Sequence, residues 1–466
     1  MAKAKTTSLL FFCLAFGAIP IFAQDTLTVS LSSAITRSLE ISPEVRAKEA
    51  KVDFSTARYN LARASRFLPD FTATSAHSTA PALDNPNNTA AEQLYLDPDV
   101  RNDWSDLSMF NRVEFSAIQP LWTWGEIDKS IEAASAGIRV DEAVALGTEH
   151  QVAERAAQLY YALKLTEALS RLTTEAGDIV EKAKTEIDRL LEEGDLGVDY
   201  ADLFQVQITE QEFLQRVVEA EESRKIARAA LSRLLFLDED QTVTVESVLL
   251  EPLPFEPKPL TYYQNVALSF RPELKQASAG LEARSALVEV AKSNWYPKFV
   301  VGVNGKWSYA AGRERQPNPY HSDPFLSRSI QIGFAFRQNL NFGQTRAKID
   351  QAKAEASEVA FQSDAARQLI LFEVEEAYRN VLIAYAAVNS KEAQLQISKE
   401  WLRVEQVDFD LEIGDTENLV KAVRDNLSIR ATRHDAVYKY NVAIIKLLSK
   451  SGILLASIED GTLVGL

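Results

Sequence analysis

Two stretches of the chain carry apolar residues at helical spacing over an unusual length. No proline lies between Pro120 and Pro252 or after Pro324, and no glycine lies between Gly343 and Gly414. Proline breaks helices and glycine weakens them, so both stretches are predicted to be helical. Apolar residues recur there every three, four or seven positions, which indicates a coiled-coil seam: Ile127, Ile131, Ala134, Ile138, Ala145, Val152, Ala156, Leu159 and Leu163, and then Ile349, Ala352, Ala356, Val359, Ala366 and Ile370.

Each long helix is expected to end at a glycine and to be followed by a second helix that runs back. A continuous helix over 126–193 would be about 100 Å long at 1.5 Å per residue, far beyond an ordinary globular helix. Gly194 and Gly414 mark the two turns. The sequence therefore predicts two antiparallel hairpins, over about 125–237 and about 343–450.

Shorter segments alternate apolar and polar residues with a period of two, which is typical of β-strands with two different faces. The alternation predicts strands over about 298–311 and 328–341, and more weakly over about 71–80 and 112–122. Five of the six tryptophans lie in or beside these segments. Two interpretations remain open on this pattern: a soluble sandwich with a tryptophan core, or a membrane β-barrel with interfacial aromatic girdles.

The chain is an internal duplication. Matching motifs occur in the same order in both halves: "SPEV" and "RPEL", "RFLPDF" and "NWYPKF", "QPLWTWGE" and "QNLNFGQ", "EEGDLG" and "EIGDTE", and the leucine-rich helix ends. Each half reads as helix, strand, loop, strand, long helix and returning helix. The predicted fold is therefore mostly α with a small β part, built from a duplicated unit with four strands per chain.

This reading divides the chain into four parts. Residues 1–23 have the basic start and apolar run of a secretory signal peptide. Residues 24–250 form the first repeat, 251–259 a proline-rich linker and 260–466 the second repeat. Cys13, the only cysteine, falls within the predicted signal peptide, so we expect no disulfide in the mature chain.

Composition and motifs argue against catalysis and against nucleic-acid binding. The formal net charge is -16, which disfavours nucleic acid as a partner. No known catalytic or phosphate-binding motif is present, so we expect no enzymatic activity, no cofactor and no metal site. The four histidines are scattered, and we expect surface positions rather than ligand positions for them: His77, His150, His321 and His434.

The duplicated order of these motifs resembles the TolC-type outer-membrane efflux proteins over essentially the whole mature chain. The resemblance implies a homotrimer in which a twelve-stranded outer-membrane β-barrel continues into a long periplasmic α-helical barrel. It also implies a periplasmic adaptor and an inner-membrane transporter as partners, outer-membrane lipid around the barrel, and a role as the exit duct of an efflux or secretion system. The expected location is the outer membrane of a Gram-negative bacterium, extending into the periplasm.

Part of this follows from physical chemistry alone. Four strands are too few to close a barrel, and open strand edges in lipid cost several kcal/mol per unpaired group. Known membrane barrels have at least about eight strands, so the chain must assemble with copies of itself. The strand count allows two or three copies, and the resemblance selects three. The alternative function is a periplasmic coiled-coil adaptor or scaffold of an export complex.

Two sets of residues are candidate functional positions. In the family the periplasmic tip carries acidic residues that constrict the pore, and "YADLFQVQ" matches the family pattern, with Asp202 in the acidic position. In the second half Val420 stands about where that acid would be, so an acidic gate from the second hairpin is in doubt; these tip acids could equally be solvated helix-terminal residues. The tip candidates are Asp195, Asp199, Asp202, Asp415 and Glu417, and the predicted lipid-facing residues are Val301, Val303, Ile332 and Phe334.

Overall fold

A computed structural model describes residues 25–193, 200–238, 240–315, 323–411 and 416–459. The predicted signal peptide lies outside the described residues. Contacts divide the chain into two units, one made of 1–38, 156–251 and 391–438, and the other of 39–155, 252–390 and 439–466. We call them the hairpin unit and the sheet unit, and each is described by itself.

The elements follow one another in the duplicated order. The first half contains β1 (Asp25–Val29), α1 (Leu31–Ile41), α2 (Pro43–Ala64), β2 (Asp70–Asp84), the short 3-10 helix η1 (Leu94–Leu96), β3 (Arg101–Trp122), α3 (Glu126–Glu193), α4 (Tyr200–Leu234) and β4 (Gln241–Val245). The second half contains α5 (Leu260–Phe270), α6 (Pro272–Ser293), β5 (Lys298–Ala310), β6 (Arg328–Arg337), α7 (Phe342–Asp410), α8 (Thr416–Lys450) and α9 (Leu454–Glu459).

In each half, the helical segment that precedes the first strand of the four-stranded sheet is divided into two helices at the proline of the "SPEV" or "RPEL" motif. Pro43 begins α2 and Pro272 begins α6, where the missing N–H costs nothing because the first turn has no acceptor for it. The Ser42 side chain accepts a hydrogen bond from the Val45 amide and caps α2. Both helices are 22 residues long, so the duplication is preserved residue for residue in this element.

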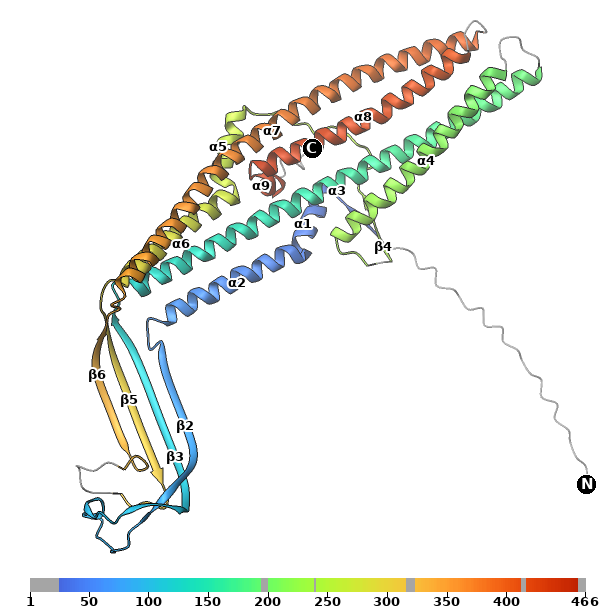
Figure 1. The fold of residues 1–466 in the computed structure, drawn as a ribbon. Helices are drawn as coiled ribbons and strands as arrows, with labels where there is room; N and C mark the ends of the chain where they lie inside the picture. The colour runs from blue at the N-terminus through green and yellow to red at the C-terminus, as the bar shows by residue number, and fades with distance from the viewer. Residues whose placement is uncertain (1–24, 194–199, 239, 316–322, 412–415, 460–466) are drawn as a thin grey trace, which may run out of the picture. The chain divides into compact units, whose positions relative to one another are not determined.

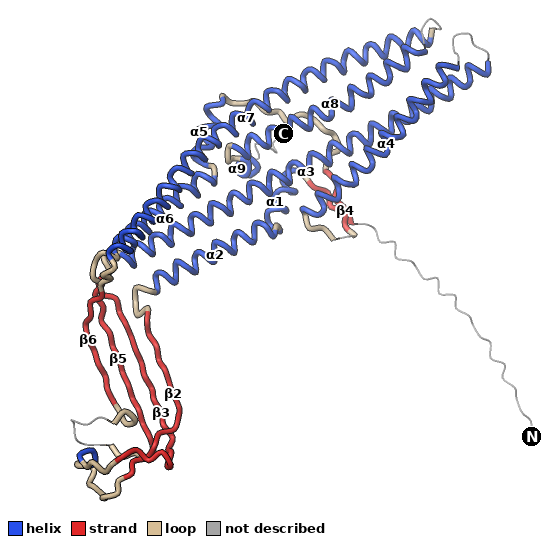
Figure 2. The backbone as a smooth tube through the Cα atoms, viewed as in Figure 1, coloured by secondary structure: helices blue, strands red, loops and turns tan. Residues whose placement is uncertain are grey.

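The sheet unit holds an antiparallel sheet of four strands in the order β2–β3–β5–β6 (Figure 1, Figure 2). The expected period-two segments are strands, but their extents differ. β3 begins at Arg101, well before the expected start at about 112, because its polar first half pairs with the distal part of β2 past a register shift at Pro81. β6 ends at Arg337 rather than at about 341. The two outer strands, β2 and β6, each have one edge without a partner strand among the described residues.

Four helices of the sheet unit follow the same order as the strands. Arg155 of α3 pairs with Glu44 of α2 at 3.0 Å, which places α2 beside α3. Gly280 of α6 lies between two neighbours: a Cβ there would contact Val140 of α3 at 4.0 Å and Val359 of α7 at 3.7 Å. The order is therefore α2–α3–α6–α7, an open array in which α2 and α7 are the outer members.

The hairpin unit contains the two expected antiparallel pairs, α3 with α4 and α7 with α8. Lys184 of α3 bonds Glu210 of α4 at 2.9 Å, and the buried Asn426 of α8 donates to the Ser398 hydroxyl of α7 at 2.9 Å. The same unit contains a parallel pair of short strands, β1 and β4. No pattern in the sequence predicted that pair, because five residues are too few to establish a period.

The segment that joins β5 to β6 is anchored by a buried ion pair. Arg313 and Asp323 have side chains that are both 3% exposed, and their Nε and Oδ2 atoms lie 2.7 Å apart. The Arg313 guanidinium also donates to the Pro81 carbonyl at 2.6 Å and to the Asn102 side chain at 2.9 Å. These bonds tie the end of the second repeat's strands to the end of the first repeat's strands.

Gly305 provides a test of the sheet's internal packing. A Cβ at Gly305 would overlap with the ring of Phe115, its cross-strand partner on β3, so Phe115 covers the glycine. Gly305→Val should displace the ring and destabilise the sheet by about 1–3 kcal/mol. The measurement is the thermal midpoint of the detergent-purified protein. Gly333→Val is the matched control, because a Cβ at Gly333 meets nothing within 4 Å. Equal shifts for both variants would contradict this packing.

Candidate functional site

The register of the four strands gathers apolar residues on one face of the sheet. Directly paired residues in an antiparallel sheet point to the same side. Val301 pairs with Phe334 and Val303 with Ile332, so the four predicted lipid-facing residues share one face. Pairing carries that face across all four strands to a set comprising Phe71, Ala73, Val113, Phe115, Ala117, Val301, Val303, Trp307, Ile330, Ile332 and Phe334. We call this set the apolar face.

The opposite side of the sheet is polar. Glu114 pairs with Lys306, and Ser116 pairs with Asn304, which in turn pairs with Gln331. On the apolar face the β6 side chains are exposed, with Phe334 83% exposed, and Val301 and Val303 of β5 are partly exposed. Burying such a face would contribute about 25 cal/mol per Å². An exposed apolar sheet of this kind indicates an apolar medium or a partner surface.

Aromatic residues gather at both ends of the apolar face. Where the strands meet the helices, Trp124 stacks on Tyr296 at 4.8 Å and its indole N–H donates to the Pro297 carbonyl at 2.9 Å. Toward the other end Trp307 stacks on Tyr309. Phe299 and Trp307 are separated by eight residues, about 27 Å along a strand, which is close to the height of the apolar band of membrane barrels.

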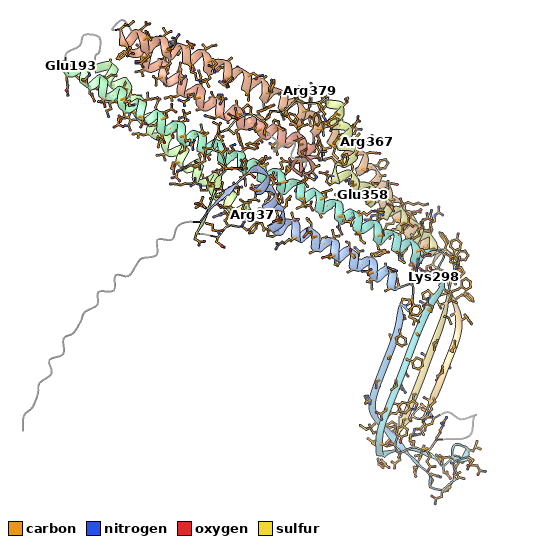
Figure 3. All side chains as sticks on the ribbon, turned by 180° about the vertical axis from the view of Figure 1, so that it is seen from behind. Arg37, Glu193, Lys298, Glu358, Arg367 and Arg379 are labelled. Atoms are coloured by element: carbon orange, nitrogen blue, oxygen red, sulfur yellow. The ribbon has the colours of Figure 1, made fainter. Side chains whose placement is uncertain are left out.

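The connections between helices and strands contain residues with left-handed backbone conformation. Leu68, just before Pro69, has φ of 41°, and Trp124 and Gly125, just before α3, have φ of 54° and 83°. Lys298, labelled in Figure 3, lies at the start of β5. It forms an ion pair with Glu126, at the start of α3, at 2.6 Å. These contacts hold the sheet end and the start of the long helix in one arrangement.

Two of the five candidate tip acids lie at the start of the returning helices. Asp195, Asp199 and Asp415 lie outside the described residues. Asp202 lies in the first turn of α4, and Glu417 lies exposed in the first turn of α8. Both are therefore at helix N-termini, where the macrodipole favours carboxylates whatever their function. Glu193, the last residue of α3, adds an acid that the sequence reading did not single out (Figure 3).

Val420 has a structural role that explains the departure from the family pattern. It packs against a cluster formed by the buried Ile187 of α3 and Val206 of α4, together with Leu191 and Leu203. The side chain at this position therefore joins the second hairpin to the first. A carboxylate here would sit among apolar side chains, which is costly without a partner.

An ion pair also links the two hairpins, and a groove lies beside it. Arg430 of α8 donates two hydrogen bonds to Glu175 of α3, at 2.8 and 2.6 Å, and this interaction holds the pKa of Glu175 below its usual value. Beside it lies a groove of about 560 Å³ between α3, α4 and α8. Its lining combines apolar side chains, Leu172, Phe213 and Leu427 among them, with charged ones such as Arg216 and Glu219.

One histidine departs from the expected surface position. His150 is buried on the side of α3 that faces α6, and burial, reinforced by the nearby charges of Arg271 and Lys275, lowers its pKa to about 4. His434 is partly buried, and burial likewise lowers its pKa. His77 bonds Asn111 at 2.6 Å on the sheet, and His321 lies outside the described residues.

Within the described ranges, no cluster of three or more His, Cys, Asp or Glu side chains is arranged to hold a metal ion. Among the helices of the described residues, none has the length and apolarity that crossing a bilayer requires.

Comparison with known proteins matches part of the chain to one family model and most of the chain to solved structures. Residues 264–428 match a family model described as "Outer membrane efflux protein". No curated protein sequence matches the chain. Among solved structures, the fold is similar to the Campylobacter jejuni CmeC outer membrane channel, with a TM-score of 0.72 at 16% identity over 91% of this chain and 86% of that one. It is also similar to the open state of the Neisseria gonorrhoeae MtrE outer membrane channel, with a TM-score of 0.70 at 17% identity over 91% and 89%. The outer membrane protein VceC of Vibrio cholerae gives 0.70 at 15% identity over 91% and 96%.

The role of Val420 can be tested by placing a carboxylate there. Val420→Asp should destabilise the hairpin unit by about 1–3 kcal/mol, because an unpaired polar group would enter an apolar cluster. The readout is the helical melting midpoint measured by circular dichroism. Asn418→Asp, exposed in the same first turn of α8, should leave the midpoint within error. An unchanged midpoint for Val420→Asp would show that position 420 does not pack against the first hairpin.

Proposed function

We propose that the chain is a member of the outer membrane efflux protein family, whose model matches residues 264–428, and that it forms the exit duct of a tripartite efflux or type I secretion system. Members of that family are TolC-type outer-membrane efflux channels without enzymatic activity. Transport through the duct is passive: the channel carries substrates across the outer membrane and the periplasm. The observation that carries this proposal is the four-stranded sheet with one exposed apolar face and two unpaired edges.

The apolar face is the lipid-facing surface of the barrel. It combines exposed aliphatic side chains with aromatic residues at its two ends, which is the pattern of membrane barrel strands. The polar side, with Glu114, Lys306 and Gln331, then lines a water-filled lumen. The proposed lipid-facing residues are Val301, Val303, Ile332 and Phe334. The strand pairing supports this role, because Val301 lies opposite Phe334 and Val303 lies opposite Ile332 on one face of the sheet.

A charge on either side of β5 tests this assignment. Val303→Arg would place a guanidinium toward hydrocarbon, at a cost of about 2–4 kcal/mol near the bilayer midplane, and should reduce the amount of heat-modifiable, assembled protein in outer membranes. Asn304→Arg lies one residue further on the same strand and faces the lumen, so assembly should be retained. If the two variants assembled equally, the apolar face would not be the lipid-facing one.

The chain acts within a larger assembly. Channels of this family are trimeric components of efflux systems. A homotrimer of this chain would supply twelve strands, three times the four strands of its sheet, enough to close a barrel. A periplasmic adaptor and an inner-membrane transporter complete the path for the substrate. The groove between α3, α4 and α8 is a surface that the helices of such an adaptor would contact, since it offers apolar side chains between charged ones.

The hairpin turns form the periplasmic entrance of the duct, and their acids give it a preference for cations. Three copies of the five candidate acids would bring fifteen carboxylates around one opening. Rings of carboxylates select cations in channels, an effect that salt weakens beyond a Debye length of about 10 Å at 0.1 M. Asp202 is the first choice, since it alone fits the family pattern. The packing of Val420 supports a ring to which the second hairpin contributes through Glu417 and Asp415 instead.

Single-channel recording in planar bilayers tests the duct and the entrance together. The wild-type protein should form ion-conducting pores that prefer cations. Asp202→Asn, and the double variant Asp415→Asn with Glu417→Gln, should reduce that preference and any block by divalent ions added on the periplasmic side. Pores that keep the parent's selectivity in both variants would make these acids ordinary helix-terminal residues, whereas the absence of any pore from the wild type would contradict the duct itself.

A further inference from the structure

The polar side of the sheet carries more cations than acids, although the chain as a whole is acidic. Residues on this side either pair directly with one another across strands or lie two positions apart along one strand. From the strand ends at the helices to the register shift at Pro81, this side holds four cations and two acids: Arg112, Lys298, Lys306, Arg337, Asp70 and Glu114. The whole sequence has 66 acids against 50 lysines and arginines, so the balance of charge is reversed on this surface.

The cations nearest the helices are compensated by acids. Lys298 forms an ion pair with Glu126 at 2.6 Å. Arg337 lies opposite Lys298 in the strand register, and Asp70 begins β2 at the same end of the sheet. Two positive charges and two negative charges therefore meet at this end, and it carries no net charge.

The excess of positive charge lies further along the strands, at Lys306 and Arg112. Glu114 is opposite Lys306 in the register and two residues from Arg112 on β3. The Arg112 Nε lies 3.7 Å from the Glu114 carboxylate, which is longer than a hydrogen bond, and it has no hydrogen-bond partner among the described residues. Within the same part of the chain, the Lys306 ammonium forms no ion pair. One carboxylate thus faces two cations, which leaves one positive charge per chain in excess.

The segment after β5 folds across the polar side of the sheet. We call its described residues, 311–315 and 323–327, the strap. A Cβ at Gly312 would lie 2.9 Å from the Ser108 Cβ on β3, and Ser108 belongs to the polar side because it pairs with Ala80. Arg313 donates to the Pro81 carbonyl of β2 at 2.6 Å. The strap therefore runs from β5 over β3 to β2.

The strap lies beside Arg112 without neutralising it. The Phe110 ring centroid is 5.4 Å from the Arg112 guanidinium carbon and 5.5 Å from the ring centroid of Phe325, which belongs to the strap. The strap adds no net charge, since it contains two arginines and two acids: Arg313, Arg315, Glu314 and Asp323. It therefore adds bulk to the polar side next to the two cations and leaves their charge in place.

We propose that this surface is an anion-attracting zone in the outer part of the duct, with Lys306 as its principal group and Arg112 as its second. The inference rests on the proposed function, in which the polar side of the sheet lines the lumen. Three copies would place three uncompensated positive charges at one level of the barrel, and rings of Lys or Arg on a pore wall favour anions. The zone favours anionic cargo, such as carboxylates, sulfates and organic phosphates, and is opposite in sign to the acids proposed for the entrance.

Charged thiol reagents measure the sign of the potential at this surface. In a Cys13→Ala background, Asn304→Cys places a thiol at an exposed position of the polar side, two residues from Lys306. Membrane-assembled protein is treated with an anionic and a cationic methanethiosulfonate of similar size. Relative to their rates with free cysteine, the anionic reagent should react several-fold faster. This preference should weaken when salt is raised from about 0.1 M to about 1 M, since the Debye length falls from about 10 Å to about 3 Å.

Further variants separate the charge of Lys306 from a purely structural role. Lys306→Gln should lower the preference for the anionic reagent several-fold, whereas Lys306→Arg keeps the charge and should keep the preference. Glu114→Gln removes the opposing carboxylate and should raise it. Asn418→Cys, exposed at the start of α8 beside the acid Glu417, is the matched probe at the other candidate surface and should prefer the cationic reagent.

The outcomes separate this inference from the proposed function. An anionic preference at position 304 that falls with Lys306→Gln and rises with Glu114→Gln supports the zone. Equal relative rates, a faster cationic reagent, or a thiol that neither reagent reaches would each overturn the zone, while ion-conducting pores from the wild-type protein in planar bilayers would leave the duct in place. A wild-type protein that forms no pore overturns both.

Discussion

The unpaired edges of β2 and β6 are the constraint on which the rest of the structure depends. Each edge carries backbone N–H and C=O groups that water can satisfy in solution and that hydrocarbon cannot. An apolar face beside such edges is therefore stable in a membrane only if every edge finds a partner strand. A sheet of four strands has too few members to pair its own ends, so the edges require further copies of the chain.

The helices of the sheet unit are arranged in the same order as the strands. The array α2–α3–α6–α7 has the order of β2–β3–β5–β6, since each long helix continues from the strand before it through a tight corner. Alanine, glycine and proline at seven-residue spacing allow the helices to approach closely along the internal seam. The helix array and the sheet are open for the same reason. The two repeats contact each other once, through α3 with α6 and β3 with β5, and each repeat keeps its other side without a partner among the described residues. In the proposed assembly, each chain supplies a two-repeat segment of a longer cyclic structure.

Much of this architecture can be predicted from the sequence because its signals are long. The absence of proline through both long helices, and of glycine through α7, indicates helices of the observed length. The alternation around Val301 and Ile332 predicts which residues of β5 and β6 share a face, and the strand pairing agrees. Short or context-dependent features could not be predicted. The β1–β4 pair has too few residues for a period, and the polar first half of β3 lacks alternation. His150 looks like a surface residue until the α6 contact that buries it is known.

The role of the candidate tip acids could not be predicted from the sequence for a different reason. Three of them lie outside the described residues, and the first-turn positions of Asp202 and Glu417 suit a solvated carboxylate as well as a pore-lining one. The packing of Val420 became visible only in three dimensions, because it depends on Ile187 and Val206 from the other hairpin. Packing near the turns thus depends on side chains from two hairpins, whereas the apolar face follows from the alternation within single strands.

The central claim is that edge pairing in lipid forces the chain to assemble with itself. The most direct measurement is the protein mass of the detergent-purified complex by light scattering, with the detergent contribution subtracted. The account predicts a mass three times that of one mature chain. A mass equal to that of a single chain, in protein that is folded and stable in detergent, would contradict it.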